Sequence, residues 1–330
     1  MNTIGAFPDI RMRRRRSHAW LRDMVAETSL QPADLVLPLF VMEGEGKQEA
    51  IAAMPGVYRL SIDAIVTKAR EAHQLGIPAI ALFPVIDPSL KTHQGEASHD
   101  PDNLICRTIA AIKKTLPGLG IICDVALDPY TISGHDGVLM DGVIANDETV
   151  AVLCKQALTL AEAGCDIVAP SDMMDGRVLA IRRVLDSKQF LSVNILSYAV
   201  KYASCLYGPF RQAVGSAKNL GHADKKTYQM DYRNSREAIL EAALDAQEGA
   251  DMLMVKPATW YLDIIATVKP QLSIPVLAYQ VSGEYAMIQA AAAQGYLDAS
   301  AALYESLIAC KRAGASAIFT YGACEVAASL

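Results

Sequence analysis

The chain has 330 residues, of which 52% are hydrophobic and 20% charged, and its net charge is −6. This size supports a large core, and the acidic balance argues against general nucleic-acid binding, which needs a basic surface. No apolar run approaches the roughly 20 residues that span a bilayer, and no apolar signal segment opens the chain, so we expect a cytoplasmic protein with no membrane contact. The seven cysteines are scattered and form no CxxC pair, which argues against a disulfide framework or a zinc ribbon.

The densest charged segment lies near the N-terminus, where residues 11–16 read Arg-Met-Arg-Arg-Arg-Arg. Its simplest interpretation is a solvated arm, and nucleic-acid contact is a minor alternative. We therefore divide the chain into an N-terminal arm over residues 1–30 and a single folded domain over residues 31–330.

Short apolar β-rich runs alternate with longer helical patterns throughout the second part. The expected strands are 35–41, 79–83, 120–125, 166–169, 191–196, 251–256, 275–279 and 317–320. The expected helices are 62–75, 102–114, 147–163, 175–185, 235–247, 261–268, 286–294 and 300–313, and several should end at glycine, as at Gly76, Gly164, Gly249, Gly295 and Gly314. Eight such units without a linker favour an α/β fold of the closed (β/α)8 TIM-barrel type over an open sheet. No GxGxxG or Walker loop follows the first strand.

Two lysines follow otherwise apolar strand-like runs. Residues 252–255 lead directly into Lys256, and residues 191–196 lead through four further residues to Lys201. A buried ammonium is costly unless it is paired or loses its proton, and a neutral lysine is a nucleophile that forms Schiff bases with carbonyl compounds. A single strand-end lysine more often reaches into solvent. Two of them suggest that the site holds two carbonyl groups.

The barrel hypothesis predicts which side chains meet. Active sites of such barrels lie at the carboxyl ends of the strands. The residues at these ends come from six strands, and they are the segment 124–128, Ser171, Asp172, Lys201, Lys256, Ser282 and Tyr321.

Several of these segments together resemble the porphobilinogen synthase family, also called delta-aminolevulinic acid dehydratase. Met-Val-Lys-Pro at 254–257, followed by Tyr-Leu-Asp-Ile at 261–264, is similar to the segment around that family's second Schiff-base lysine. Residues 197–204 with Tyr-Gly-Pro-Phe-Arg at 207–211 are similar to the segment around the first. Residues 169–177 and 279–285 add further matches, and the resemblance extends from the arginine-rich arm to residues 320–323.

The resemblance implies a lyase that condenses two molecules of 5-aminolevulinic acid to porphobilinogen, in tetrapyrrole and haem biosynthesis. Lys256 would bind one substrate ketone as a Schiff base and Lys201 the other. Two nearby ammonium groups repel each other, so at least one lysine pKa should fall.

The resemblance also implies how the substrates are held. One substrate carboxylate would be bound by Arg211, Lys225 and Gln229, and the other by Ser282 and Tyr321. Asp124 and Ser171 would be polar partners of the substrate amino group or of Lys201. Residues 208–221, rich in small side chains, would form a lid that excludes water.

The chain departs from the family's zinc-dependent members. Their three cysteines match Ala126, Asp128 and Asp136 here, and Ser133 stands where many members have histidine. Thiolates suit zinc, whereas carboxylates suit magnesium or monovalent ions. We therefore expect no catalytic zinc, keep Asp128 and Asp136 as weak metal candidates, and leave open a reaction without any active-site metal.

A second metal site, away from the chemistry, is implied by the same resemblance. Glu241 lies 15 residues before Lys256 and matches a glutamate that binds activating Mg²⁺, an allosteric role. Asp172 would assist without binding the ion directly. Magnesium keeps most of its waters, so one glutamate is sufficient. The alternative is an ordinary surface glutamate on a helix.

Two other functions compete with this hypothesis. A class I aldolase on a similar barrel would need only one essential lysine, and a binding protein would use the arginine arm on an acidic partner. The resemblance instead implies an arm that embraces a neighbouring subunit and buries Ile10, Trp20 and Leu21 only on assembly. We expect a homo-octamer built from arm-exchanged dimers, with a hexamer as the alternative.

Overall fold

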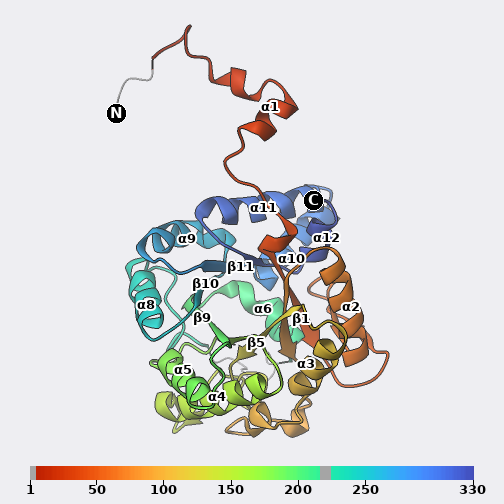
Figure 1. Cartoon of the computed structure of the whole chain (residues 1–330), viewed down its shortest axis with the longest axis vertical. Helices are drawn as coiled ribbons and strands as arrows, with labels where there is room; N and C mark the ends of the chain where they lie inside the picture. Colours follow the sequence, from red (N-terminus) through yellow and green to blue (C-terminus); the bar gives the residue numbers. More distant parts are fainter. Residues whose placement is uncertain (1–4, 216–223) are drawn as a thin grey trace.

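Eight parallel strands close into a barrel in the computed structural model of the chain (Figure 1), which describes residues 5–215 and 224–330. The first and last barrel strands pair in parallel through Leu35↔Ile318 and Val36↔Phe319, which closes the sheet. The expected (β/α)8 barrel is confirmed. In order around the barrel the strands are β1 (Leu35–Val41), β4 (Ala79–Pro84), β5 (Gly120–Val125), β8 (Ile167–Pro170), β9 (Asn194–Lys201), β10 (Met252–Lys256), β11 (Val276–Tyr279) and β12 (Ile318–Phe319).

Helices surround the sheet (Figure 1). They are α2 (Ile62–Gln74), α3 (Leu104–Thr115), α4 (Asn146–Glu162), α5 (Arg177–Ser187), α6 (Gly208–Ala213), α8 (Arg236–Gln247), α9 (Leu262–Val268), α10 (Ser282–Ala293), α11 (Ala299–Ala313) and α12 (Ala323–Ala327). Short 3-10 turns are η2 (Pro32–Asp34), η3 (Pro88–Leu90), η4 (Glu96–His99), η5 (Cys205–Tyr207), η6 (Thr259–Tyr261) and η7 (Lys269–Gln271). Within the described ranges, no helix combines the length and apolar character needed to cross a membrane.

Local sequence explains where these helices begin and end. The Asn103 side chain accepts a hydrogen bond from the backbone of Cys106 at 2.9 Å and caps α3, whose apolar face is buried. Asp298 caps α11 in the same way through Ala301 at 2.7 Å. The helix ends at Gly314 with φ +117°, which a residue with a side chain rarely adopts. All five glycines expected to end helices have positive φ.

Two predicted elements had the wrong bounds. The fifth barrel strand runs from Asn194 to Lys201 rather than over 191–196, because the chain still turns out of α5 before Asn194 and Leu191 is exposed. The helix after β11 begins at Ser282 rather than at 286. The buried carboxylate of Glu284 accepts backbone hydrogen bonds from Val281 at 2.6 Å and Thr259 at 2.5 Å, which stabilises the extra first turn.

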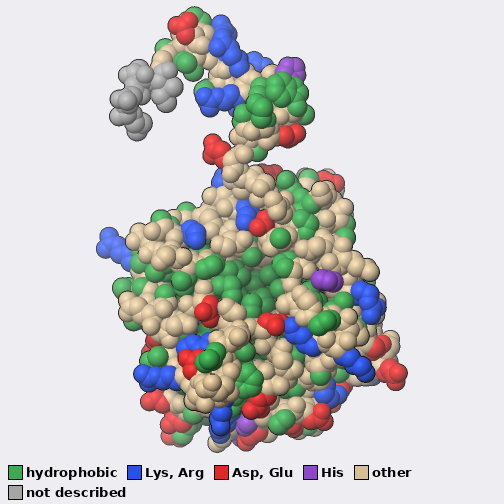
Figure 2. Space-filling view, in the orientation of Figure 1, with side chains coloured by type: hydrophobic (Ala, Val, Ile, Leu, Met, Phe, Trp, Pro, Cys, Tyr) green, Lys and Arg blue, Asp and Glu red, His purple; other side chains and the backbone are tan. Residues whose placement is uncertain are grey.

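Two small antiparallel pairs and an arm extend the barrel. β2 (Gln48–Ala50) pairs with β3 (Tyr58–Leu60), and β3 also pairs in parallel with the last two residues of β1. β6 (Leu139–Met140) pairs with β7 (Val143–Ile144). The arm contains η1 (Met12–Arg16) and α1 (Ala19–Met24). It stands away from the barrel, and its surface is mostly apolar and basic (Figures 1 and 2).

Candidate active site

Lys201 and Lys256 are direct neighbours on adjacent strands. Both are the last residues of their strands, and they are paired across β9 and β10. Leu253 pairs with Ser197 but Val255 pairs with Val200, so between these two pairs the chain advances three residues along β9 and only two along β10. Without this irregularity Lys256 would lie opposite Val200, because a one-residue slip turns a side chain to the other face. The shift therefore brings the two ammonium groups into one cavity.

Lys256 is enclosed by aromatic rings. Its Nζ lies 4.7 Å from the ring centroid of Tyr279, 5.0 Å from Tyr198, 5.3 Å from Phe210 and 5.4 Å from Tyr207. The residue is only 6% exposed. These rings come from β9, β11 and the segment that includes α6, so the cage exists only in the folded barrel.

This enclosure lowers the pKa of Lys256 to about 7, first because burial disfavours the charged form and then because Lys201 repels it. Such a change corresponds to roughly 5 kcal/mol in favour of the neutral amine. A desolvated contact between a cation and a ring offers about 2 kcal/mol in the opposite direction, so burial and repulsion dominate. Lys256 is therefore partly neutral near pH 7.

Lys201 is held in a different way. Its Nζ donates hydrogen bonds to the carboxylate of Asp136 at 3.2 Å and to the backbone oxygen of Ser171. It is 5% exposed, about as buried as Lys256. A buried ammonium that is paired with a carboxylate remains charged at a tolerable cost. The two neighbouring lysines thus differ in their partners rather than in their depth.

Asp136 is the acceptor on which several groups converge. It accepts hydrogen bonds from Lys201 and, at 2.9 Å, from the hydroxyl of Tyr228, and it forms an ion pair with Lys225 at 2.8 Å. Burial would raise the pKa of Asp136, but the charges of Lys201 and Lys225 outweigh it and lower the pKa below its ordinary value. Lys225 also reaches Asp128 at 3.4 Å.

Asp124 faces the lysines from β5. Burial raises its pKa to about 7, and repulsion by Asp128 adds to this, while a hydrogen bond with Ser171 and the two lysines oppose it. Its Oδ1 is buried and has no hydrogen-bond partner among the described residues. A carboxyl group that titrates near neutrality is suited to exchange protons with a substrate.

Nine of the predicted site residues line one cavity with a volume of about 30 Å³. That is room for about one water molecule, so larger molecules can enter only if the covering side chains move. Phe210 and Arg211 belong to the expected lid, residues 208–221, of which 216–221 lie outside the described residues. The cavity is lined by Phe83, Asp124, Asp128, Asp136, Ser171, Lys201, Tyr207, Phe210, Arg211, Lys225, Gln229 and Lys256.

Comparisons with known proteins identify the family. The family model described as "Delta-aminolevulinic acid dehydratase" matches residues 9–329. A protein of that name from Bradyrhizobium diazoefficiens is 56% identical over 97% of this chain and 91% of its own length. The chain belongs to the delta-aminolevulinic acid dehydratase family.

Further relatives agree with this assignment. The delta-aminolevulinic acid dehydratase of Chlamydia pneumoniae is 50% identical over 95% of this chain and 94% of its own length. Among solved structures, the delta-aminolevulinic acid dehydratase (porphobilinogen synthase) of Toxoplasma gondii ME49, in complex with the reaction product porphobilinogen, is 49% identical with a TM-score of 0.95. That match covers 97% of this chain and 91% of the other.

Two residues expected in the site of this family member lie just outside the cavity. The hydroxyl of Ser282 accepts a hydrogen bond from the backbone of Phe210 at 2.9 Å and donates to the backbone oxygen of Leu206 at 3.3 Å. The hydroxyl of Tyr321 is 3.0 Å from that of Tyr279, whose ring faces Lys256. Both residues therefore contact the cavity wall.

Asp172 and Glu241 both interact electrostatically with Arg177, which forms a buried ion pair with Asp245. Arg177 on α5 bonds both carboxylate oxygens of Asp245 on α8, at 2.9 and 3.2 Å, and lies 3.7 Å from Asp172. Glu241 is one turn before Asp245 and is partly buried beside a hollow, where burial raises its pKa. Several carboxylate and amide groups line this hollow together with apolar side chains and Lys226, and oxygen ligands of that kind are the ones that Mg²⁺ prefers. The lining includes Asn146, Asp175, Asp224, Asp231, Glu237 and Glu241.

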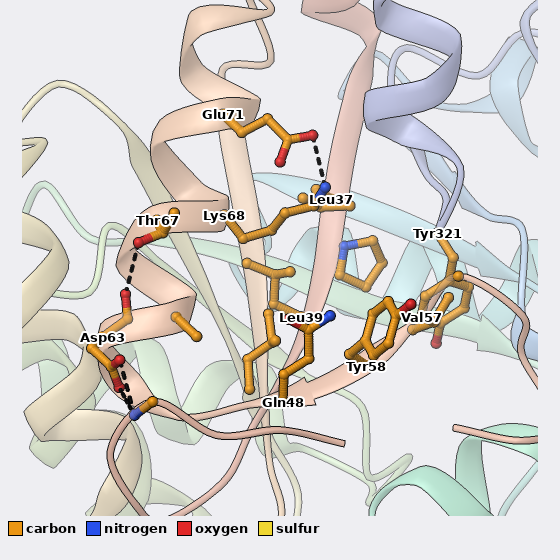
Figure 3. A pocket seen from close by; sticks show the side chains of 15 residues that line it. Leu37, Leu39, Gln48, Val57, Tyr58, Asp63, Thr67, Lys68, Glu71 and Tyr321 are labelled. Atoms are coloured by element: carbon orange, nitrogen blue, oxygen red, sulfur yellow. Dashed lines mark hydrogen bonds and ion pairs between the residues drawn. The ribbon is translucent and has the colours of Figure 1, made fainter. Parts of the chain in front are cut away.

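A larger hollow of about 460 Å³ lies outside the barrel, between α2, β1 and β3 (Figure 3). Lys68 is paired there with Glu71 at 2.8 Å, and Asp63 accepts hydrogen bonds from the backbone of Gly46. The charged residues that line it are Asp63, Lys68 and Glu71, of which the last two form an ion pair, and neither Schiff-base candidate lines it. Size alone therefore does not locate the chemistry in this protein.

Sequence reasoning assigned no role to the aromatic cage or to Tyr228. Tyr198, Tyr207 and Tyr279 stand in segments that resemble the family, but an aromatic residue near a strand end is more often ordinary core. The contact of Tyr228 with Asp136 joins segments more than 90 positions apart. No local pattern signals such a contact.

The depressed pKa of Lys256 can be measured directly. Trace acetylation of the protein with acetic anhydride, followed by mass spectrometry, should show Lys256 becoming reactive with a midpoint near pH 7. In Lys201→Met the midpoint should rise, because the neighbouring ammonium is removed. In the urea-unfolded chain it should approach ~10.4, the ordinary value for lysine. The same midpoint in folded and unfolded protein would refute the enclosure argument.

Proposed function

We propose that this chain condenses two 5-aminolevulinic acid molecules to porphobilinogen through Schiff bases on Lys256 and Lys201. The placement of these two lysines side by side at the carboxyl ends of β9 and β10 carries the proposal. A class I aldolase would need only one of them, and the match across nearly the whole chain is to dehydratases. The enzyme is then a lyase of porphyrin biosynthesis.

Lys256 is suited to be a first nucleophile. Its amine is partly neutral near pH 7, so it can attack the ketone carbon of one substrate without a separate base. The ketone oxygen then leaves as water when the imine forms. The aromatic cage keeps the surrounding space apolar, which disfavours hydrolysis of that imine.

Lys201 needs a place for its proton before it can act on the second ketone. Its hydrogen bond to Asp136 orients the amine, and Asp124, with a pKa of about 7, can accept or return a proton nearby. Holding both substrates on adjacent strands turns a reaction between two molecules into one within a single site. Asp124 and Ser171 would also bind a substrate amino group.

The two substrate carboxylates require separate donors. Arg211, Lys225 and Gln229 line the same side of the cavity and would bind one of them. The Oε1 atom of Gln229 is buried without a partner among the described residues, so its amide is free to turn toward a ligand. Ser282 and Tyr321, at the cavity wall, would bind the other.

Trapping the imine tests these roles. Sodium borohydride added with 5-aminolevulinic acid should attach substrate covalently to Lys256, as read by peptide mass spectrometry. Lys256→Met should lose this label and reduce turnover by more than about 10³-fold. The matched control Lys226→Met removes an exposed lysine next to Lys225 and should keep both. Labelling only at positions other than Lys256 and Lys201 would contradict the assignment.

We further propose that Mg²⁺ activates the enzyme from Glu241, with Asp172 assisting through Arg177. A single partly buried glutamate fits an ion that keeps most of its waters. In the described ranges no group of three or more His, Cys, Asp or Glu side chains is arranged to hold a metal ion. When bound, the ion would supply positive charge beside α8, away from the reacting atoms.

Substitution of Glu241 tests this site. Glu241→Gln should abolish stimulation of turnover by Mg²⁺ and leave basal turnover within about twofold, since the residue does not line the catalytic cavity. Glu237→Gln, which changes a neighbour one turn earlier in the same hollow, should retain stimulation. Equal stimulation in both variants would exclude Glu241 as the site.

Self-association is the remaining part of the proposal. We take residues 1–30 as the arm and residues 31–330 as the catalytic domain. In the arm, Phe7 is 74% exposed and Trp20 63% exposed. Large apolar side chains on an extended segment favour burial against another molecule. We propose arm-exchanged dimers that assemble into an octamer, with a hexamer as the alternative. The seven free cysteines support a reducing, cytoplasmic location.

A further inference from the structure

The two aspartates at the family's cysteine positions are already bound to the chain's own cations. Lys225 Nζ lies between them, 2.8 Å from Asp136 and 3.4 Å from Asp128. All three side chains are buried. A buried ammonium needs carboxylate partners, and Lys225 has two of them, so its positive charge is compensated from both sides.

Both oxygens of Asp136 and one oxygen of Asp128 are engaged by neighbouring donors. Asp136 accepts hydrogen bonds from Lys201 and from the Tyr228 hydroxyl in addition to its contact with Lys225. A buried lysine outside the cavity, Lys91, interacts electrostatically with Asp128. The Lys91 segment is tied to the Asp128 loop by backbone hydrogen bonds from Thr92 to Tyr130 and from Ile132 to Thr92.

This arrangement does not fit a bound metal ion. A divalent ion bridging the two side chains would compete for the Asp136 oxygens and for Asp128 Oδ2, which already contact ammonium or hydroxyl groups. A second cation placed between these carboxylates would also lie within a few ångströms of Lys225, and like charges repel strongly in a buried site. The residues therefore disagree with a metal at this position.

We propose that Lys225 is a built-in cation that takes the place of a metal ion between Asp128 and Asp136. Its ammonium supplies fixed positive charge beside Lys201 without any exchange with solvent. This inference rests on the proposed function in one respect, because a substrate carboxylate that binds Lys225 must compete with the two aspartates for it. The ion pair between Asp128 and Lys225 must be weakened when a substrate carboxylate binds Lys225, so Asp128 lowers the affinity for substrate.

Metal binding by full-length variants tests whether the Lys225 ammonium takes the place of a metal ion. All variants also carry Glu241→Gln, so that the proposed Mg²⁺ site is absent. The electron paramagnetic resonance signal measures free Mn²⁺, and the bound amount is the total minus the free amount. Glu241→Gln should bind no Mn²⁺ in this cavity. Adding Lys225→Met should create one site per chain, at least about 10-fold tighter than in the parent, and adding Asp128→Asn should abolish it. Lys225→Arg, which keeps the charge, should bind none.

Two results would overturn the proposal. One is Mn²⁺ binding that depends on Asp128 while Lys225 is still present, and the other is a folded Lys225→Met variant that gains no site. Neither result depends on turnover, so failure of the proposed function is distinguished from failure of this inference. If Lys225→Met does not fold, Asp128→Asn alone decides the question. It should lower the KM for 5-aminolevulinic acid by about threefold or more, and an unchanged or higher KM would contradict the competition.

Discussion

Two lysines placed side by side in a buried cavity cannot both carry an uncompensated charge, and the site depends on how that conflict is resolved. At a separation of about one strand spacing, ~5 Å, two ammonium groups repel by roughly 3 kcal/mol at an effective dielectric constant of about 20. Lys201 forms an ion pair with Asp136, whereas Lys256 has no ion pair among the described residues and lies among aromatic rings. The result is one ion-paired amine beside one partly neutral amine at the ends of paired strands. That difference lets the enzyme begin with a nucleophile at neutral pH.

The other charged residues of the cavity contribute to the difference between Lys201 and Lys256. Asp136 is surrounded by donors and stays ionised, so it can hold Lys201 in place. Asp124 has a raised pKa and can exchange protons where Asp136 cannot. The surroundings therefore lower the pKa of Asp136 and raise that of Asp124, so that one carboxylate stays ionised and the other can exchange protons. Lys225 joins these groups, since it forms ion pairs with Asp128 and Asp136 in the same cavity, where we propose that it also binds a substrate carboxylate.

Much of this structure was predictable from sequence, and the exceptions share a physical cause. Alternating apolar strands and capped helices predicted the barrel, and the rule that strand ends meet brought Asp124, Ser171 and the two lysines together. The irregular register between β9 and β10 has no local signal in the sequence. The strand was predicted to end at 196, so Lys201 was not recognised as a strand residue. The partners of Asp136 and the rings around Lys256 come from segments far apart in the chain. Contacts of that kind are set by the closed barrel rather than by neighbouring sequence.

The central claim is that fixed side-chain charges, without zinc, carry out the condensation. Porphobilinogen formation from 5-aminolevulinic acid, measured after exhaustive treatment with a zinc chelator and again after adding Mg²⁺ or Zn²⁺, tests it most directly. The account predicts that turnover survives chelation and that Mg²⁺ increases it. Complete loss of turnover that only Zn²⁺ restores would contradict the account.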